Sequence, residues 1–282
     1  MVQIGVHVSI AGGVDRAVER AAEKGCDLFQ IFSRNPRGWS SKPLSAEDAE
    51  RFVRKFKESG LSLAVDQMPY LPNLASPKED VYLRSVEALA AELVRCHQLH
   101  IPFLVTHMGS HLGMGWEQGF LRIVAGIEKA FDQADNEVML LLENTAGTRN
   151  SMGSSFEDIA AIIDALDARR LGICLDTCHL FAAGYDLRTA ESLQATLDQF
   201  QSAIGLQKLL LLHLNDCRGD LAARMDRHEH VGLGKIGEQG FRAILNHPAL
   251  RSLPIIMETP VDSRRDDLGN LHAARTLDLA RK

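Results

Sequence analysis

Short apolar runs alternate with longer amphipathic stretches along the whole chain. Runs of roughly four to eight residues rich in β-branched side chains predict buried strands, and apolar positions three and four apart predict helices. Strands are expected at residues 3–8, 28–32, 61–66, 103–107, 138–144, 171–177, 208–215 and 254–259. Helices are expected over residues 14–24, 46–59, 81–100, 118–134, 156–166, 193–204 and 241–245. Ser45 and Asp48 are typical of a capped helix start.

The order of these elements predicts an α/β protein with a parallel sheet. Eight strand-helix units favour a closed (β/α)8 TIM barrel, and 282 residues suit one such barrel, which commonly takes about 250. No G-x-G-x-x-G spacing follows the first predicted strand, which argues against an open dinucleotide-binding sheet. Because no linker or internal repeat interrupts the pattern, we predict a single domain over residues 1–282. Long polar loops at residues 33–43 and 218–237 indicate a functional rim.

Composition narrows the class of protein. With 45% hydrophobic and 24% charged residues, the chain is typical of a globular protein and not of a disordered or collagen-like one. A formal net charge of -6 argues against indiscriminate binding to polyanions, and it leaves room for a local basic rim. Five thinly spread cysteines, no secretion signal and no apolar stretch of membrane-spanning length predict a cytoplasmic protein without a membrane partner.

Side chains that can bind metal fall near the C-terminal ends of the last five predicted strands. These are His107, Glu143, Asp176, His213 and Glu258, and the loops that follow add His179, Asp226 and His228. In a barrel the strand ends meet at one mouth, where barrel enzymes build their active sites. A cluster of carboxylates is unfavourable unless cations neutralise it, so this convergence predicts bound metal. Imidazole with carboxylate and no thiolate is typical of catalytic zinc, manganese or iron.

Single residues of these kinds have simpler explanations. One acidic residue or histidine near a strand end is more often an ion pair or a satisfied core histidine, with a functional prior of roughly one in four. Cys174 and Cys178 have a C-x3-C spacing, and we interpret them as packing residues. His7 and His111 lie near strand ends, where we expect them to hydrogen-bond to ligands or substrate.

Three motifs carry a family resemblance, in the order LDTCHLFAAGYD, LHLND and DRHEHVGLGKIG. Together with GVHVSIAGG, FSRNPRGW, PYLPNLAS, VTHMGSHLG, LLENTAG and METP, they make the chain resemble the endonuclease IV family over nearly its whole length. That family, AP endonuclease family 2, comprises zinc-dependent apurinic/apyrimidinic endonucleases of base-excision repair. The resemblance implies the same barrel and a site that binds up to three metal ions, usually Zn2+, with Mn2+ as an alternative.

The resemblance also implies which residues bind each ion. It assigns the first ion to His107 and Glu143, the second to Glu143, Asp176, His213 and Glu258, and the third to His179, Asp226 and His228. One further ligand position, on the first ion, is typically a histidine in the family, and this chain has Gln67 there.

Gln67 places a neutral, weakly basic amide oxygen where the family has an imidazole. We therefore expect zinc to be held less tightly at the first site. Three interpretations stay open: a natural variant that uses a different metal or only two ions, an engineered substitution, or a protein that binds damaged DNA with reduced catalysis.

The reaction that the resemblance implies is hydrolysis of the phosphodiester on the 5′ side of abasic sites in duplex DNA, leaving a 3′-hydroxyl and a 5′-deoxyribose phosphate. Metal ions suit this reaction because they acidify the attacking water and neutralise phosphate oxygens. The expected catalytic residues are Glu143, which would hold the first two metals together, and Glu258, which would orient the nucleophile.

Recognition of the DNA needs other side chains. In the family, residues matching Arg37, Tyr70 and Leu71 enter the DNA at the lesion, where an arginine and an apolar wedge fill the stack. Further basic contacts with DNA are expected at Arg34, Arg149, Arg218, Arg224 and Arg227, in loops at the same mouth. A monomer would leave this mouth free for duplex DNA.

Two alternatives stand beside this hypothesis. Metal-dependent sugar isomerases and epimerases resemble the chain in barrel and ligand types, although they generally need fewer metals and lack loops suited to DNA. A non-catalytic protein that binds abasic sites would keep the arginine and wedge contacts and lose turnover through Gln67.

Overall fold

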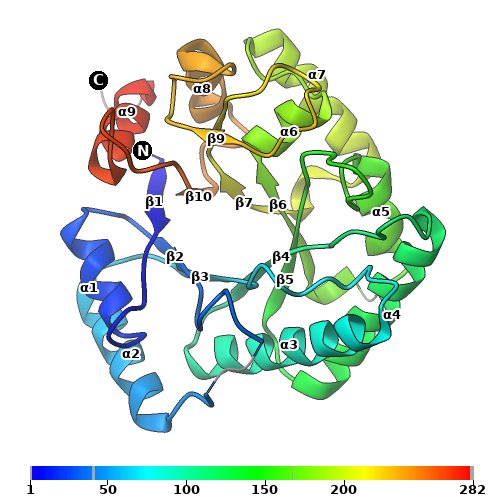
Figure 1. Cartoon of the computed structure of the whole chain (residues 1–282). Coiled ribbons are helices and arrows are strands. Elements are labelled where there is room, and N and C mark those ends of the chain that lie inside the picture. Colours follow the sequence, from blue (N-terminus) through cyan, green and yellow to red (C-terminus); the bar gives the residue numbers. More distant parts are fainter. Residues whose placement is uncertain (1, 40–41, 167, 280–282) are drawn as a thin grey trace.

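Eight parallel strands close into a barrel at the centre of the molecule. The computed structural model describes residues 2–39, 42–166 and 168–279, so residues 40 and 41 of the predicted 33–43 loop lie outside the described residues. In order around the barrel the strands are β1 (Gln3–His7), β10 (Pro254–Met257), β7 (Leu209–His213), β6 (Leu171–Asp176), β5 (Met139–Glu143), β4 (Phe103–His107), β3 (Ala64–Gln67) and β2 (Phe29–Ile31). Helices surround this barrel (Figure 1), which confirms the predicted TIM barrel.

The helices lie around the barrel, and α6 (Thr177–Ala183) is buried on nearly all sides. They are α1 (Arg16–Glu23), α2 (Ala46–Ser59), α3 (Glu79–Gln98), α4 (Trp116–Ala134), α5 (Phe156–Asp164), α6 (Thr177–Ala183), α7 (Ala190–Ala203), α8 (Gly237–Asn246) and α9 (Asp267–Leu277), with short 3-10 helices η1 (Ala168–Arg170) and η2 (Leu206–Lys208). Helix α2 begins as predicted, because the Ser45 hydroxyl accepts a hydrogen bond of 3.1 Å from the backbone N–H of Asp48. Among the described residues, no helix combines the length and the apolar character that crossing a bilayer requires.

Several elements differ from the predicted pattern. Helix α6 starts directly after β6, because Asp176 ends the strand and its side chain also caps the helix by accepting from the backbone N–H of His179. With no polar turn between them, the pattern assigns Thr177 to the strand and misses the helix. It also misses α9 and a small hairpin of β8 (Asp216–Cys217) and β9 (His228–Glu229), whose strands of two residues are too short to show alternation. Strand β3 lies later than predicted and includes Gln67.

The interior of the barrel is a layer of apolar side chains. It consists of Leu28, Val65, Val105, Leu141, Cys174, Leu211 and Ile256. Because side chains alternate along a strand, the residue two positions further on faces the same interior, one layer closer to the mouth. Those positions are occupied by Gln30, Gln67, His107, Glu143, Asp176, His213 and Glu258. Because side chains on a strand face the same side every second residue, the candidate ligands lie directly above the packed apolar layer.

Strand β1 follows the same rule with a smaller residue. At Gly5 an added Cβ would lie 1.7 Å from the carbonyl oxygen of Leu28, so only glycine permits this close approach of β1 and β2. Two residues further, His7 faces the mouth beside Gln30, its register partner. Cys174 is buried in the interior layer, in agreement with its interpretation as a packing residue.

A candidate metal centre at the barrel mouth

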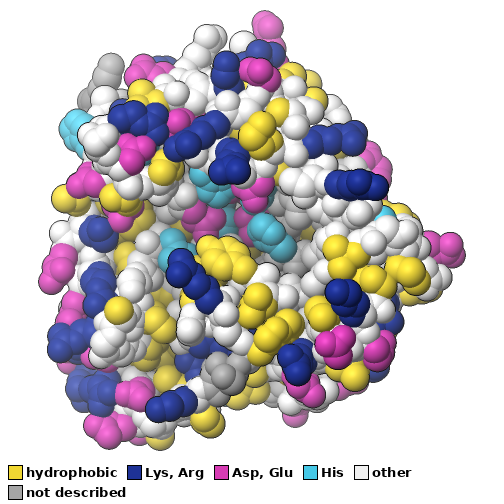
Figure 2. Space-filling model, in the orientation of Figure 1, with side chains coloured by type: hydrophobic (Ala, Val, Ile, Leu, Met, Phe, Trp, Pro, Cys, Tyr) yellow, Lys and Arg dark blue, Asp and Glu magenta, His cyan; other side chains and the backbone are white. Residues whose placement is uncertain are grey.

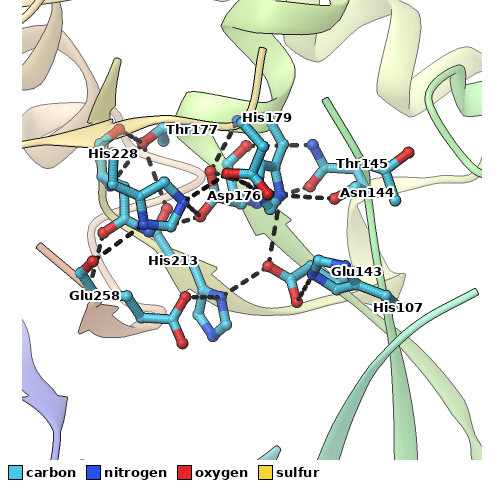
Figure 3. A network of polar contacts seen from close by, with 12 residues as sticks. His107, Glu143, Asn144, Thr145, Asp176, Thr177, His179, His213, His228 and Glu258 are labelled. Atoms are coloured by element: carbon cyan, nitrogen blue, oxygen red, sulfur yellow. Dashed lines mark hydrogen bonds and ion pairs between the residues drawn. The ribbon is translucent and has the colours of Figure 1, made fainter. Parts of the chain in front are cut away.

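Carboxylates and imidazoles from separate strands meet at the C-terminal mouth of the barrel. Strand register sets His107 beside Glu143 and Asp176 beside His213, and Glu258 directly follows β10. In Figure 2 histidine and acidic side chains gather around the central hollow, with Lys and Arg around them. Figure 3 shows the carboxylates and imidazoles pointing toward one another. The structure therefore brings together the residues that the sequence predicts as ligands.

These side chains form overlapping groups whose potential ligand atoms lie within 4.8 Å of one another. The groups are Glu143, Asp176, His213 and Glu258; His179, Asp226 and His228; and His107, Glu143 and His179. A fourth group joins the Cys178 thiol to Asp176 and His228, a proximity that the sequence does not predict. The first two groups correspond to the second and third metal sites that the family resemblance implies.

The group around His213 has a surplus of acceptor atoms. His213 Nδ1 lies 3.0 Å from Glu143 Oε1 and 3.5 Å from Glu258 Oε2. These two carboxylate oxygens can only accept, so the arrangement needs either a proton on Nδ1 or a cation between the three atoms. The donor set of carboxylates and imidazole fits a divalent metal ion such as zinc.

In the group around His228, one buried nitrogen has no hydrogen-bond partner. His228 Nδ1 lies 3.0 Å from the carbonyl oxygen of Glu258 and donates to it, which leaves Nε2 as the acceptor. Nε2 is buried and has no hydrogen bond among the described residues, although it lies 3.5 Å from Asp226 Oδ1 and 3.6 Å from Asp176 Oδ2. An unpaired imidazole nitrogen between two carboxylates is the arrangement that a metal ion completes.

His179 is oriented in the same way. Its Nδ1 donates to the carbonyl oxygen of Asn144, 2.9 Å away, and its Nε2 lies 3.2 Å from Asp226 Oδ1. Asp176 is fixed by the cap of α6 and by Asn215, whose amide nitrogen donates to Asp176 Oδ2 at 2.6 Å. Such supporting hydrogen bonds set the tautomer and direction of metal ligands. The sequence predicts neither asparagine, although both stand inside the motifs LLENTAG and LHLND.

The electrostatics of the cluster favour charged groups despite burial. Burial raises the pKa of Glu143, but His107 and His213 outweigh it and hold that pKa well below its ordinary value. Burial lowers the pKa of His179, but Asp176 and Asp226 raise it to about 10. The hydrogen bond from His179 lowers the pKa of Asp226 to about 2. Near neutral pH the imidazole nitrogens therefore carry protons, and a metal ion must displace these protons in order to bind.

The group around His107 fits a metal ion less well. His107 Nε2 lies 2.8 Å from Glu143 Oε2, and Gln67 stands at the end of the neighbouring strand. Gln67 Oε1 accepts a hydrogen bond of 2.8 Å from Gln30, so its amide nitrogen is the atom that faces Glu143 Oε2, at 3.5 Å. Gln67 thus presents hydrogens to this corner, where a metal ligand would present a lone pair.

The rim of the mouth carries exposed aromatic, apolar and basic side chains. Tyr70 is 74% exposed and Leu71 38% exposed, and the Tyr70 ring makes an edge contact with Phe32 at 5.0 Å between ring centroids. Arg37 and Arg227 are exposed. Two adjoining clefts of about 420 and 340 Å³ open beside Tyr70 and both reach the candidate metal centre.

One expectation is wrong at the rim. Arg34, which the sequence predicts to contact DNA, is buried and forms an ion pair with the buried Glu92 of α3. His111 Nδ1 accepts hydrogen bonds from the backbone N–H of Gly113 and Gly115, at 3.2 and 3.1 Å, so this side chain shapes the loop after β4. A contact of His111 with substrate stays a prediction. Arg149 and Arg224 are exposed, and Arg218, half-exposed, pairs with Glu229 at 3.3 Å.

Fold and site together define a class: TIM-barrel proteins with a cluster of metal-capable side chains at the C-terminal mouth. The family described as xylose isomerase-like TIM barrel matches residues 18–280. "Probable endonuclease 4" of Methanoculleus marisnigri is 58% identical over 279 residues, which cover 98% of this chain and 99% of that protein. The crystal structure of endonuclease IV from Thermus thermophilus matches with a TM-score of 0.88 and 37% identity, over 99% of this chain and 100% of that one. The chain belongs to the endonuclease IV family.

A more distant likeness concerns the fold alone. A D-tagatose 3-epimerase-like protein matches with a TM-score of 0.72 at 18% identity, over 97% of this chain and 95% of that one. At this identity the barrel is shared and the chemistry need not be.

Proposed function

We propose that this protein repairs DNA by hydrolysing the phosphodiester on the 5′ side of abasic sites in duplex DNA, leaving a 3′-hydroxyl and a 5′-deoxyribose phosphate. As a member of the endonuclease IV family it is a metal-dependent AP endonuclease, a hydrolase that acts on DNA. The observation that carries the proposal is the cluster of four carboxylates and four imidazoles at the barrel mouth, beside an exposed aromatic and apolar rim.

We assign two firmly held metal ions to this cluster. The ligands of one are Glu143, Asp176, His213 and Glu258, and those of the other are His179, Asp226 and His228. His107 and Glu143 would hold a further ion more weakly, because Gln67 directs its amide hydrogens toward Glu143. We expect Zn2+, with Mn2+ as the alternative. Bound divalent ions neutralise phosphate oxygens and acidify the attacking water.

Two carboxylates have distinct roles in this proposal. Glu143 is fully buried and its two oxygens face His107 at 2.8 Å and His213 at 3.0 Å, so it joins the two halves of the centre. Glu258 lines the larger cleft, and its carboxylate is partly exposed there. We therefore assign Glu258 to orient the attacking water.

Four rim residues recognise the lesion. Tyr70 and Leu71 are exposed large side chains, aromatic and aliphatic. Inserting them into a gap in the base stack would bury them. Arg37 and Arg227 supply positive charge to the phosphates around that gap. An abasic nucleotide neither stacks nor pairs, so turning it outward costs less than turning out a normal nucleotide.

The test is incision of a duplex that carries one tetrahydrofuran abasic analogue, which cannot undergo β-elimination. The protein is assayed as purified, after chelation, and after zinc or manganese is restored. Metal-dependent cleavage 5′ to the analogue supports the proposal. Lesion binding without cleavage would indicate a damaged first metal site, and neither binding nor cleavage would favour a sugar isomerase or epimerase.

We further propose that the protein works as a cytoplasmic or nucleoid-associated monomer. The five cysteines are free and buried in the described structure, which suits a reducing compartment. A duplex needs the whole mouth, and the exposed rim around it suits one subunit acting alone. Size-exclusion chromatography with light scattering checks the oligomeric state, and the mass of a dimer would contradict the proposal.

A further inference from the structure

Gln30 lies at the barrel mouth among the candidate ligands, and its neutral amide hydrogen-bonds to several of them. It is a fully buried residue of β2, in the same layer as the ligands. Its amide contacts four residues of the site: His7, Gln67, His213 and Glu258. A polar side chain with this many contacts at the heart of the site calls for a specific role.

The contact with a carboxylate fixes the orientation of this amide. Gln30 Nε2 lies 2.7 Å from Glu258 Oε1, and because a carboxylate only accepts, the amide nitrogen is the atom that faces it. The amide oxygen must then face His213 Nε2, which lies 2.9 Å away and therefore carries the hydrogen. The other ring nitrogen, Nδ1, is the one that faces the oxygen of Glu143 at 3.0 Å.

We propose that Gln30 is a positioning residue for the metal site of Glu143, Asp176, His213 and Glu258. By accepting from Nε2–H of His213, it leaves the Nδ1 lone pair directed into that site. By donating to Oε1 of Glu258, it leaves Oε2 of the same carboxylate facing Nδ1. This role rests on the proposed function, which assigns these residues as metal ligands. Hydrogen bonds of this kind typically change metal affinity by about 10- to 100-fold.

The same amide weakens the neighbouring metal site, which lies at His107, Glu143 and Gln67. An amide nitrogen has two hydrogens, and the second short contact of Gln30 Nε2 is with Gln67 Oε1, at 2.8 Å. The oxygen that Gln67 could offer to a metal ion is thus engaged, and its NH2 group faces Glu143. Gln30 therefore strengthens one metal site and withdraws a ligand atom from the other.

The first experiment measures zinc retention by the holoenzyme of Gln30→Met, which keeps the length of the side chain and loses its hydrogen bonds. Samples are dialysed against graded chelator, and zinc per chain is counted by mass spectrometry. We expect one zinc ion to leave at about 10- to 100-fold lower chelator strength than in the wild type. The control is Thr196→Val, which removes a partly buried hydrogen bond to the backbone of Asp186, outside the site. Wild-type retention in Gln30→Met, or equal loss in the control, would overturn the proposal.

A second measurement needs no variant and keeps the proposal testable if Gln30→Met does not fold. Long-range nitrogen-proton NMR of the zinc-loaded wild type identifies which nitrogen of His213 carries the hydrogen. We expect hydrogen on Nε2 and metal on Nδ1, and the reverse assignment would overturn the proposal. Incision of abasic duplex is measured separately, so a zinc-binding protein that fails to cut refutes the proposed function and leaves the result on Gln30 intact.

Discussion

Replacing Gln67 with histidine tests whether one side chain limits the metal centre. The substitution puts an imidazole at the corner where His107 Nε2 and Gln67 Nε2 now face the same oxygen of Glu143, at 2.8 and 3.5 Å. Because His107 and Glu143 are already in place, the new imidazole completes a set of nitrogen and oxygen ligands suited to zinc.

The size of the effect follows from two opposing contributions. A zinc ion with four protein ligands binds with about 10–16 kcal/mol, which is roughly 3 kcal/mol for each ligand. Against this, Gln30 loses the acceptor that Gln67 Oε1 provides at 2.8 Å, which costs about 1 kcal/mol. The net gain of about 2 kcal/mol corresponds to zinc held about 30-fold more tightly at this site.

The assay counts zinc per chain after dialysis against graded chelator and measures single-turnover incision of the tetrahydrofuran duplex. We expect Gln67→His to retain one more zinc ion than the wild type and to cut faster. Gln67→Leu is the matched control, since it removes the amide without supplying a ligand, and we expect no gain from it. If zinc content and incision both stay unchanged in Gln67→His, Gln67 does not limit the first site and the reasoning fails.

Three further predictions concern catalysis, DNA binding and pH. Glu258→Gln removes a charge and keeps the shape, so incision should nearly vanish while binding of abasic duplex persists in a gel-shift assay; full activity would remove Glu258 from the mechanism. Tyr70→Ala removes a side chain that is 74% exposed, so thermal stability should stay within about 0.5 kcal/mol, while abasic-site affinity, measured by fluorescence anisotropy, falls about 10- to 100-fold. In the metal-free protein the raised pKa of His179, about 10 against an ordinary 6.5, stabilises the fold fully below about pH 6.5 and less as pH rises toward 10. The gain in melting temperature on adding zinc should therefore grow from pH 6 to pH 9, because fewer protons compete with the metal; a gain that shrinks would contradict this.

Much of the fold and of the candidate site follows from local pattern. Short apolar runs rich in β-branched residues predict the barrel strands, and a parallel barrel brings all their C-terminal ends to one mouth. His107, Glu143 and His213 are therefore predictable as neighbours although they are far apart in the chain. Their positions two residues beyond the interior layer supply the direction of the side chains as well.

Other parts of the site depend on contacts that no local pattern reveals. Gln30 stands in a strand beside apolar residues, and only the closed barrel shows that its amide meets Glu258 and His213. Its position two residues after the inward-facing Leu28 is the one feature of the sequence that could have marked it. Asn144 and Asn215, which hydrogen-bond to the ligands, are also not predictable from the sequence, because these contacts form only when the neighbouring strands are in place.

The burial of Arg34 explains how the loop that carries Arg37 is held. Arg34 pairs with Glu92 of α3, and Ser33 joins the same carboxylate through a hydrogen bond of 2.5 Å from its hydroxyl. The backbone N–H of Ser33 also donates to Asp66 of β3, at 2.9 Å. A charged side chain placed in the interior is stable only with such partners, and they tie the start of the loop to the barrel wall. The two arginines therefore have different roles: Arg34 anchors the loop in the interior, and Arg37 projects from the same loop toward solvent.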